Sequence, residues 1–250
     1  MASLQDGHAI YVEGLHKSFG DWPVLWDLDL TVEWGQFLAL FGVNGAGKTT
    51  LLRILSTQAR AEAGKVLVAG YDSRRQAEAI RRCIGVVGHR GLLYEDLTCR
   101  ENLVFYGRLF ALQDIHQQVE TVLSRVGLQR RADHRVRTLS HGMQKRLAIA
   151  RAVLHHPRIL LLDEPEGGLD RESVAMLKGL LEEWTQSGGV VVMTTHNVEL
   201  GLEWAHRAAV LASGKVHFQD DSDYRDPAEI QRLLTTTSAP GLARPVETRP

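Results

Sequence analysis

Cysteine is scarce in this sequence. Its 250 residues include only Cys83 and Cys99, and these do not form a Cys-x-x-Cys pair. A disulfide-stabilised secreted domain usually has an even number of at least four cysteines, and a metal cluster needs closely spaced cysteines. These two cysteines meet neither requirement. We therefore expect a protein of a reducing compartment.

Long apolar runs are also missing. A helix that crosses a bilayer needs about 18 consecutive apolar residues, whereas the longest runs here, at 159–162 and 190–193, have the length of strands. The first residues, MASLQDGHAIYVEG, lack a basic segment followed by an apolar one, so we expect no secretion signal. If this protein works at a membrane, a separate protein must anchor it.

Neither sign of charge is in excess. The 29 Lys and Arg residues nearly balance the 30 Asp and Glu residues, which gives a formal net charge of -1. No general attraction to nucleic acid or to an anionic membrane is expected, and nucleic acid is not a predicted partner. The 44% of hydrophobic residues is enough for one large core, with or without a small satellite domain.

Short apolar runs of two kinds are present. The stretch LWDLDLTVE at 25–33 alternates apolar and polar residues, which is typical of an antiparallel strand with one wet face. Continuous apolar runs indicate strands buried on both faces, and these are QFLALFG at 36–42, IGVVG at 84–88, RILLLDE at 158–164 and GVVVMTTH at 189–196. Helical stretches separate these strands, so the sequence predicts an α/β fold with a parallel sheet.

The pattern changes twice more along the chain. Between 98 and 140, apolar residues such as Leu103, Tyr106 and Phe110 recur every three or four positions, which predicts an inserted α-helical subdomain. The tail at 235–250 is rich in Thr and Pro and has no apolar period. We expect this tail to be disordered and the folded unit to span 8–234.

A glycine-rich loop joins a predicted strand to a predicted helix. The stretch GVNGAGKTT at 42–50 has the sequence and the context of a P-loop. Its glycines let backbone N–H groups face phosphates, Lys48 can reach the β- and γ-phosphates, and the Thr49 hydroxyl can bind Mg²⁺. The complete motif disfavours the alternative of a glycine turn without a ligand. The predicted nucleotide-binding residues are Gly42, Val43, Asn44, Gly45, Ala46, Gly47, Lys48, Thr49 and Thr50.

Two carboxylates end the apolar run at 158–164. Asp163 occupies the position from which P-loop ATPases hold Mg²⁺, so we predict that it binds the metal together with Thr49. Glu164 follows at once and can accept a proton from an attacking water or orient it. An Asp-Glu pair at a strand end is by itself more often a solvated cap. Its combination with the P-loop predicts catalysis by Glu164.

The other motifs follow in a fixed order. LSHGMQKRLAIARA begins at 139, GGLD ends at Asp170 and TTH ends at His196. With the P-loop and the LLLDEP stretch, this order resembles the nucleotide-binding subunit of an ATP-binding cassette (ABC) transporter over about 10–219. The resemblance implies a RecA-like P-loop NTPase core, an N-terminal antiparallel β subdomain and an inserted helical subdomain. It also implies ATP and Mg²⁺ as ligands, with hydrolysis of ATP to ADP and phosphate.

Such cassettes pair head to tail, so the resemblance implies a second ATP-binding subunit, identical or different. Ser140 and the backbone of Gly142 would then contact the γ-phosphate of the nucleotide in the partner's P-loop. Both stand at the start of a helix, where free N–H groups and the helix dipole attract an anion. Asp170 would lie in the loop that connects the two sites.

The resemblance gives roles to two further side chains. His196 would hydrogen-bond the γ-phosphate and hold the water and Glu164 in place. Phe19 stands where the family usually has an aromatic ring against adenine, and any aromatic face can stack. The alternative for Phe19 is a core residue, with Trp22 nearby as a substitute.

The sequence departs from the family pattern at two places. The family's signature motif usually reads LSGGQ, and the corresponding stretch at 139–143 is LSHGM. His141 replaces the first Gly and Met143 replaces the Gln, while Ser140 and Gly142 remain. We therefore expect nucleotide binding with altered contacts. His89 occupies the position at which the family commonly has a Gln that touches Mg²⁺. An imidazole can accept a hydrogen bond from metal-bound water, although Mg²⁺ prefers oxygen ligands, and the alternative is a surface histidine.

The stretch at 86–109 resembles the ATP-binding subunit of the haem exporter used in cytochrome c maturation. We therefore expect an ATPase at the cytoplasmic face of the membrane that powers export through a separate integral membrane subunit, with haem as the cargo that this resemblance implies. The alternative is an ABC-2 type exporter of a drug, lipid or polysaccharide. The single uninterrupted cassette disfavours a soluble ABC ATPase that acts on nucleic acid. Glu164 and the signature pattern disfavour a P-loop kinase.

Overall fold

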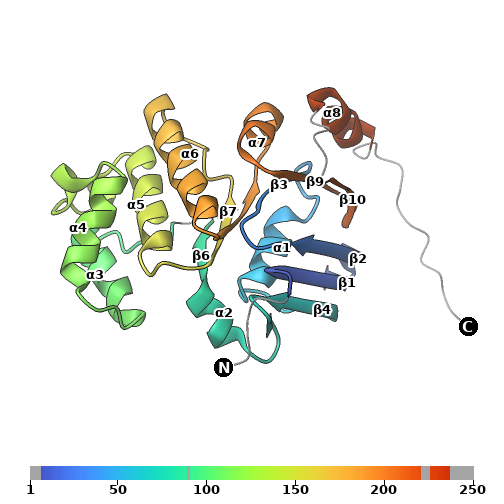
Figure 1. The fold of residues 1–250 in the computed structure, drawn as a ribbon, viewed down its shortest axis with the longest axis horizontal. Coiled ribbons are helices and arrows are strands. Elements are labelled where there is room, and N and C mark those ends of the chain that lie inside the picture. Colours follow the sequence, from blue (N-terminus) through green and yellow to red (C-terminus); the bar gives the residue numbers. More distant parts are fainter. Residues whose placement is uncertain (1–6, 89–90, 221–225, 237–250) are drawn as a thin grey trace, which may run out of the picture.

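The computed structural model describes residues 7–88, 91–220 and 226–236, with side chains at all of these except 218–220 and 236. The described residues form a four-stranded sheet, a six-stranded sheet and the helices around them (Figure 1). The predicted fold class is confirmed: a largely parallel sheet forms the core, the N-terminal part of the chain supplies an antiparallel sheet, and helices are inserted before the signature at 139–143.

The smaller sheet is antiparallel and has the strand order β2-β1-β4-β5. The alternation that predicted a strand at 25–33 belongs to β2, which pairs with β1 in a hairpin where Phe19 faces Trp22. Bulges shift the register of β1 in three places, and they break the alternation that would have revealed this strand in the sequence. The strands are β1 (Ile10–Phe19), β2 (Trp22–Val32), β4 (Ala63–Val68) and β5 (Tyr71–Asp72).

The larger sheet has the order β10-β9-β3-β8-β7-β6, with only the β10 and β9 pair antiparallel. The four continuous apolar runs form four neighbouring parallel strands of this sheet, as predicted. These are β3 (Phe37–Phe41), β8 (Val190–Thr194), β7 (Ile159–Asp163) and β6 (Ile84–Val87), followed on the other side by β9 (Arg207–Ala212) and β10 (Lys215–Asp220). Parallel strands bring their carboxyl ends to one edge, so the loops after β3, β7 and β8 meet there.

Alternate side chains of the larger sheet enter two different cores. Leu38 and Leu40 face the antiparallel sheet and α1, whereas Phe37 and Phe41 face the other layer of helices. The helices are α1 (Lys48–Leu55), α2 (Ala77–Cys83), α3 (Cys99–Leu109), α4 (Ile115–Arg125), α5 (His141–Val153), α6 (Arg171–Gln186), α7 (Val198–Trp204) and α8 (Pro227–Thr236), with short 3-10 turns at η1 (Gln129–Arg131) and η2 (Val136–Thr138).

The predicted helical insertion begins at a strong cap. The Thr98 side chain accepts a hydrogen bond from the backbone N–H of Glu101, and the Glu101 side chain accepts one from the backbone N–H of Thr98. Helices α3 and α4 follow, and α5 then returns the chain to the sheet (Figure 1). At the other end, α8 extends to Thr236, so the helix continues two residues into the segment expected to be disordered; 237–250 lies outside the described residues.

Helix α5 packs closely on β6. A Cβ atom at Gly85 would lie 2.2 Å from the carbonyl oxygen of Ala152, so only glycine allows this approach. This contact holds α5 against β6, the edge strand of the larger sheet. No helix of the described residues is long and apolar enough to cross a membrane.

Candidate functional site

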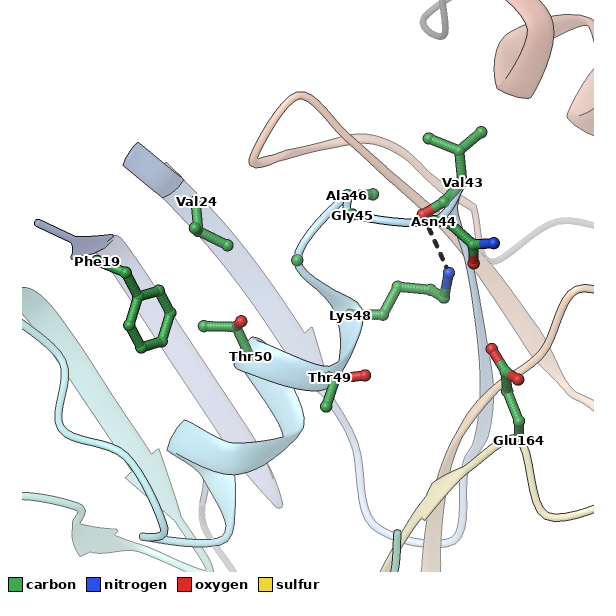
Figure 2. A pocket seen from close by; sticks show the side chains of 11 residues that line it. Phe19, Val24, Val43, Asn44, Gly45, Ala46, Lys48, Thr49, Thr50 and Glu164 are labelled. Carbon is green, nitrogen blue, oxygen red and sulfur yellow. Dashed lines mark hydrogen bonds between the residues drawn. The ribbon is translucent and has the colours of Figure 1, made fainter. Parts of the chain in front are cut away.

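The loop between β3 and α1 forms one wall of a cavity of about 470 Å³. Gly47, at the start of α1, has a φ of 108°, and a Cβ atom there would lie 2.6 Å from Cδ2 of Leu25. Glycine therefore lets β2 lie directly against the loop. Figure 2 shows the lining side chains, and the full lining is Phe19, Val24, Val43, Asn44, Gly45, Ala46, Gly47, Lys48, Thr49, Thr50 and Glu164.

Lys48 is folded onto the loop that precedes it. Its Nζ donates hydrogen bonds to the carbonyl oxygens of Gly42, at 2.5 Å, and Val43, at 3.2 Å. Burial lowers the pKa of Lys48, and the negative charges of Glu164 and Asp163 partly oppose this effect. An ammonium held by carbonyl oxygens inside such a loop can exchange them for phosphate oxygens.

Thr49, Asp163 and Thr194 form a chain of oxygen atoms beside the loop. Thr49 Oγ1 donates to Asp163 Oδ2 at 2.9 Å, and Thr194 Oγ1 donates to Asp163 Oδ1 at 2.6 Å. Asp163 is buried, so these hydroxyls fix its orientation at the end of β7. A hydroxyl and a carboxylate from two adjacent elements are the hard oxygen donors that suit Mg²⁺. The residues predicted to hold the metal therefore fit it.

Glu164 follows Asp163 in a left-handed backbone conformation, with φ at 49°. Its N–H donates to the carbonyl oxygen of Thr194, at 3.1 Å, and its own carbonyl oxygen accepts a hydrogen bond from Lys145 Nζ, at 2.8 Å. In Figure 2 the Glu164 carboxylate points toward the Lys48 and Asn44 side chains. The backbone contacts thus direct a negative side chain into the cavity.

His196 meets this carboxylate from the neighbouring strand end. Its Nε2 lies 2.5 Å from Oε1 of Glu164, and the two side chains are 43% and 28% exposed. Both groups are open to solvent at the edge of the cavity. A carboxylate and an imidazole in contact at such a position can orient a water molecule and share its proton.

Phe19 is a surface residue. It is 51% exposed and lines the cavity, and Lys17 Nζ lies 5.0 Å from the centre of its ring. The alternative of a core residue is therefore wrong. Trp22 is 80% exposed and is not part of the cavity lining, so the ring that can stack on a bound base is that of Phe19.

Six of the predicted site residues that the structure describes are not part of the cavity lining. Gly42, Asp163 and His196 each contact a residue of that lining, whereas Ser140, Gly142 and Asp170 lie at the starts of α5 and α6. Ser140 caps α5 by accepting a hydrogen bond from the N–H of Met143, at 3.3 Å, and Asp170 caps α6 by accepting one from the N–H of Ser173, at 2.8 Å. The hydrogen bond from Ser173 lowers the pKa of Asp170. Gly142 lies against the GGLD segment, since a Cβ there would be 3.2 Å from the carbonyl oxygen of Gly168. His89 lies outside the described residues.

Four residues of the site escaped the sequence analysis. Val24 lines the cavity, and Thr194 holds Asp163 and the backbone of Glu164. Lys145 donates to the carbonyl oxygen of Glu164, and Glu166 accepts a hydrogen bond from Thr195. Thr194 was visible as the first residue of TTH, but its partner lies 31 positions away. None of the four carries a local pattern that announces its role.

The fold and the site define a P-loop nucleotide hydrolase, and comparison with known proteins gives its family. A family model described as "ABC transporter" matches residues 25–167. The chain is 37% identical over 217 residues to the daunorubicin resistance ATP-binding protein DrrA3 of Streptomyces coeruleorubidus, which covers 86% of this chain and 69% of that protein. It is 36% identical to the Nod factor export ATP-binding protein I of Rhizobium sp. (strain N33), with 83% and 69% covered.

Solved structures of ABC transporter cassettes have the same fold. The chain matches the dimeric ATP-binding cassette MJ0796 in a post-hydrolysis state with ADP and Pi at a TM-score of 0.79 and 26% identity, covering 84% of this chain and 97% of that one. It matches a structure described as the ATP-binding subunit of an ABC transporter at a TM-score of 0.82 and 25% identity, covering 92% and 95%. This protein belongs to the ABC transporter family, and it is an ATP-binding, ATP-hydrolysing member of it.

Proposed function

We propose that this chain is the ATP-hydrolysing subunit of an exporter and acts at the cytoplasmic face of the membrane on a separate integral membrane subunit. One observation carries the catalytic part of the proposal: the contact between His196 and Glu164 lies at the edge of the same cavity that holds Lys48 and Thr49. Binding groups for a triphosphate and a group that activates water therefore share one site.

The residues have distinct roles in this proposal. The loop 42–50 encloses the phosphates, with Lys48 supplying a positive charge and Phe19 stacking on adenine. Thr49 and Asp163 would hold Mg²⁺, whose charge neutralises the phosphate oxygens when it is bound. Glu164 takes the proton of the attacking water.

A second subunit completes the site in the proposal. The cavity has a lining from the loop 42–50 and from Glu164, but Ser140 and Gly142 of the same chain are absent from that lining. They lie at the amino end of α5, where backbone N–H groups and the helix dipole attract an anion. We assign these groups, together with Asp170, to the nucleotide bound by a second copy or a homologous subunit. The dimeric state of MJ0796 supports this arrangement.

A drug, lipid or polysaccharide is the proposed class of cargo. The relatives described above are named for daunorubicin resistance and for export of Nod factor, and neither name concerns haem. They favour the ABC-2 type alternative over haem export. The cargo itself would be selected by the membrane subunit.

Two measurements test the proposal. Purified protein with ATP and Mg²⁺ should release inorganic phosphate without any acceptor, at a specific rate that rises with protein concentration as dimers form. Transfer of phosphate to an acceptor with no release in its absence would instead identify a kinase. A rate per subunit that does not depend on concentration, in a protein shown to be monomeric, would contradict the shared site.

The cargo is tested in the host cell. Cells in which this protein carries Glu164→Gln should retain more of the fluorescent anthracycline daunorubicin than cells with the unmodified protein, while their cytochrome c absorbance stays the same. Loss of cytochrome c absorbance with unchanged drug retention would favour haem export.

A further inference from the structure

Lys145 connects α5, called the signature helix because it begins within the signature at 139–143, to the catalytic loop of its own chain, the segment after β7 that carries Glu164. It lies in the second turn of α5, and its Nζ donates to the carbonyl oxygen of Glu164 at 2.8 Å. The side chain is partly buried, and burial lowers the pKa of Lys145. The carboxylates of Glu166, Asp163 and Glu164 oppose this effect, that of Glu166 most strongly. The Lys145 ammonium is therefore held at the backbone of Glu164, within the electrostatic influence of three carboxylates.

Glu166 also contacts the loop that carries His196. Its Oε1 accepts a hydrogen bond from the hydroxyl of Thr195, a fully buried residue that precedes His196. Thr195 also accepts a hydrogen bond from the N–H of Asn197, at 3.0 Å. The other oxygen of Glu166, Oε2, is buried and has no hydrogen-bond partner among the described residues. A carboxylate oxygen without a hydrogen bond is stabilised by a nearby positive charge, and the charge of Glu166 is the one that acts most strongly on Lys145.

The backbone of Glu164 requires such support. A residue other than glycine rarely adopts a φ of 49°, and this conformation persists only where the surroundings hold it. Strand β8 holds the N–H of Glu164 through Thr194, and Lys145 holds its carbonyl oxygen. The direction of the catalytic carboxylate therefore depends on a side chain of the signature helix.

We infer that Lys145 is a positioning residue for Glu164, with Glu166 as its counter-charge, and that it links the signature helix to hydrolysis within one subunit. This inference rests on the proposed function, in which the amino end of α5 contacts the nucleotide of the second subunit. A shift of α5 when that nucleotide binds reaches the backbone of Glu164 through Lys145. Each subunit thereby adjusts its own catalytic carboxylate to the occupancy of the opposite site.

The test compares Lys145→Met with a matched control. Methionine keeps the length of the side chain and removes its charge and its hydrogen-bond donors. The control is Arg146→Met on the next residue of α5, since Arg146 donates instead to the carbonyl oxygen of Val126, at 3.1 Å. We expect Lys145→Met to lower kcat on the order of ten- to a hundredfold without changing the KM for ATP. The control should keep the kcat of the unmodified protein. A normal kcat in Lys145→Met, or an equal loss in both variants, would overturn the inference.

A second pair of variants separates positioning from charge neutralisation. In Lys145→Met, Glu166 loses its counter-charge, whereas Lys145→Met/Glu166→Gln removes both charges and should be the more stable of the two variants. We expect this double variant to remain as slow as Lys145→Met because the carbonyl oxygen of Glu164 still lacks its donor. Recovery of normal kcat in the double variant would show that Lys145 only neutralises Glu166, and would overturn the inference.

Single-turnover measurements in the Glu164→Gln background distinguish this inference from the proposed function. We expect Lys145→Met to cause no further loss there because the side chain that it positions is already inactive. A further loss of equal size would show that Lys145 acts independently of Glu164. If Glu164→Gln alone hydrolyses ATP normally, the catalytic assignment of the proposed function fails. If it does not, and Lys145→Met has normal kcat, only the inference fails.

Discussion

Nε2 of His196 lies 2.5 Å from Oε1 of Glu164, although the two residues are 32 positions apart in the sequence. They meet because β7 and β8 are adjacent parallel strands whose carboxyl ends lie at the same edge of the sheet. The pair stands at the opening of the cavity rather than inside the core. This placement gives water access to a carboxylate that the backbone already directs toward the phosphate loop.

Replacement of Glu164 by glutamine should separate binding from hydrolysis. We expect Glu164→Gln to bind ATP normally and to lose on the order of 10² to 10⁴ in kcat, as for removal of a general base. Because the nucleotide is then not consumed, ATP should also trap the dimer. Phosphate release and size-exclusion chromatography with ATP measure the two effects. The control is Glu172→Gln, a change at an exposed carboxylate in the first turn of α6; hydrolysis at the normal rate by Glu164→Gln would remove Glu164 from the mechanism.

Ser140→Arg should block pairing of two subunits while each subunit still binds ATP. The arginine side chain would occupy the space at the amino end of α5 that the partner's phosphate requires. Ser140→Ala is the control because it also removes the cap to Met143, at a cost of about 1 kcal/mol in stability, but adds no bulk. Analytical ultracentrifugation with ATP compares the two. Dimerisation of Ser140→Arg like that of the unmodified protein would mean that the head-to-tail arrangement does not apply.

Phe19→Ala should weaken ATP binding. Stacking of a base on an aromatic ring contributes about 1–3 kcal/mol, so the Kd for ATP should rise about 5- to 150-fold. Phe19→Trp should retain the affinity, since any aromatic face can stack. Trp22→Ala serves as the control because Trp22 is exposed but does not line the cavity. Isothermal titration measures all three, and a larger effect from Trp22→Ala would assign the stacking to that residue instead.

Protonation of His155 should destabilise the fold in mild acid. The His155 ring stacks on Phe110 with centroids 3.8 Å apart, and its Nε2 contacts the carbonyl oxygen of Ile84 at 3.0 Å. Burial lowers the pKa of His155 from 6.5 to about 4. The unfolded chain therefore binds the proton more readily than the folded one. Stability is fully present above pH 6.5 and is lost as the pH falls toward 4, with a loss approaching about 3 kcal/mol.

Urea unfolding between pH 7 and pH 4 measures this loss. His155→Gln should have a flatter dependence of the unfolding free energy on pH because it has no group to protonate at that position. The control is His116→Gln, which changes an exposed histidine on α4 and should keep the steep dependence. The same slope in His155→Gln as in the unmodified protein would show that His155 is not the responsible group.

Much of the fold could be predicted because its signals are local. The runs at 36–42, 84–88, 158–164 and 189–196 became β3, β6, β7 and β8 because a strand buried on both faces needs apolar residues at every position. Other strands escaped prediction. The bulges of β1 disturb its alternation, and β5 has only two residues, Tyr71 and Asp72. The expected end of the folded unit at 234 fell short of the end of α8 at Thr236.

The sequence by itself determined the phosphate loop, because its chemistry depends on residues that are consecutive in the chain. It also determined which carboxylates stand at the end of β7, and the order of motifs pointed to the family that the comparisons then established. The family resemblance implied that His196 holds Glu164, and the fold brings the two side chains into contact. Only the tertiary structure decided that Thr194 holds Asp163 and that Lys145 supports the backbone of Glu164. These contacts join segments 19 to 32 residues apart, and no local pattern encodes them because the geometry of the sheet and the packing of α5 bring them together.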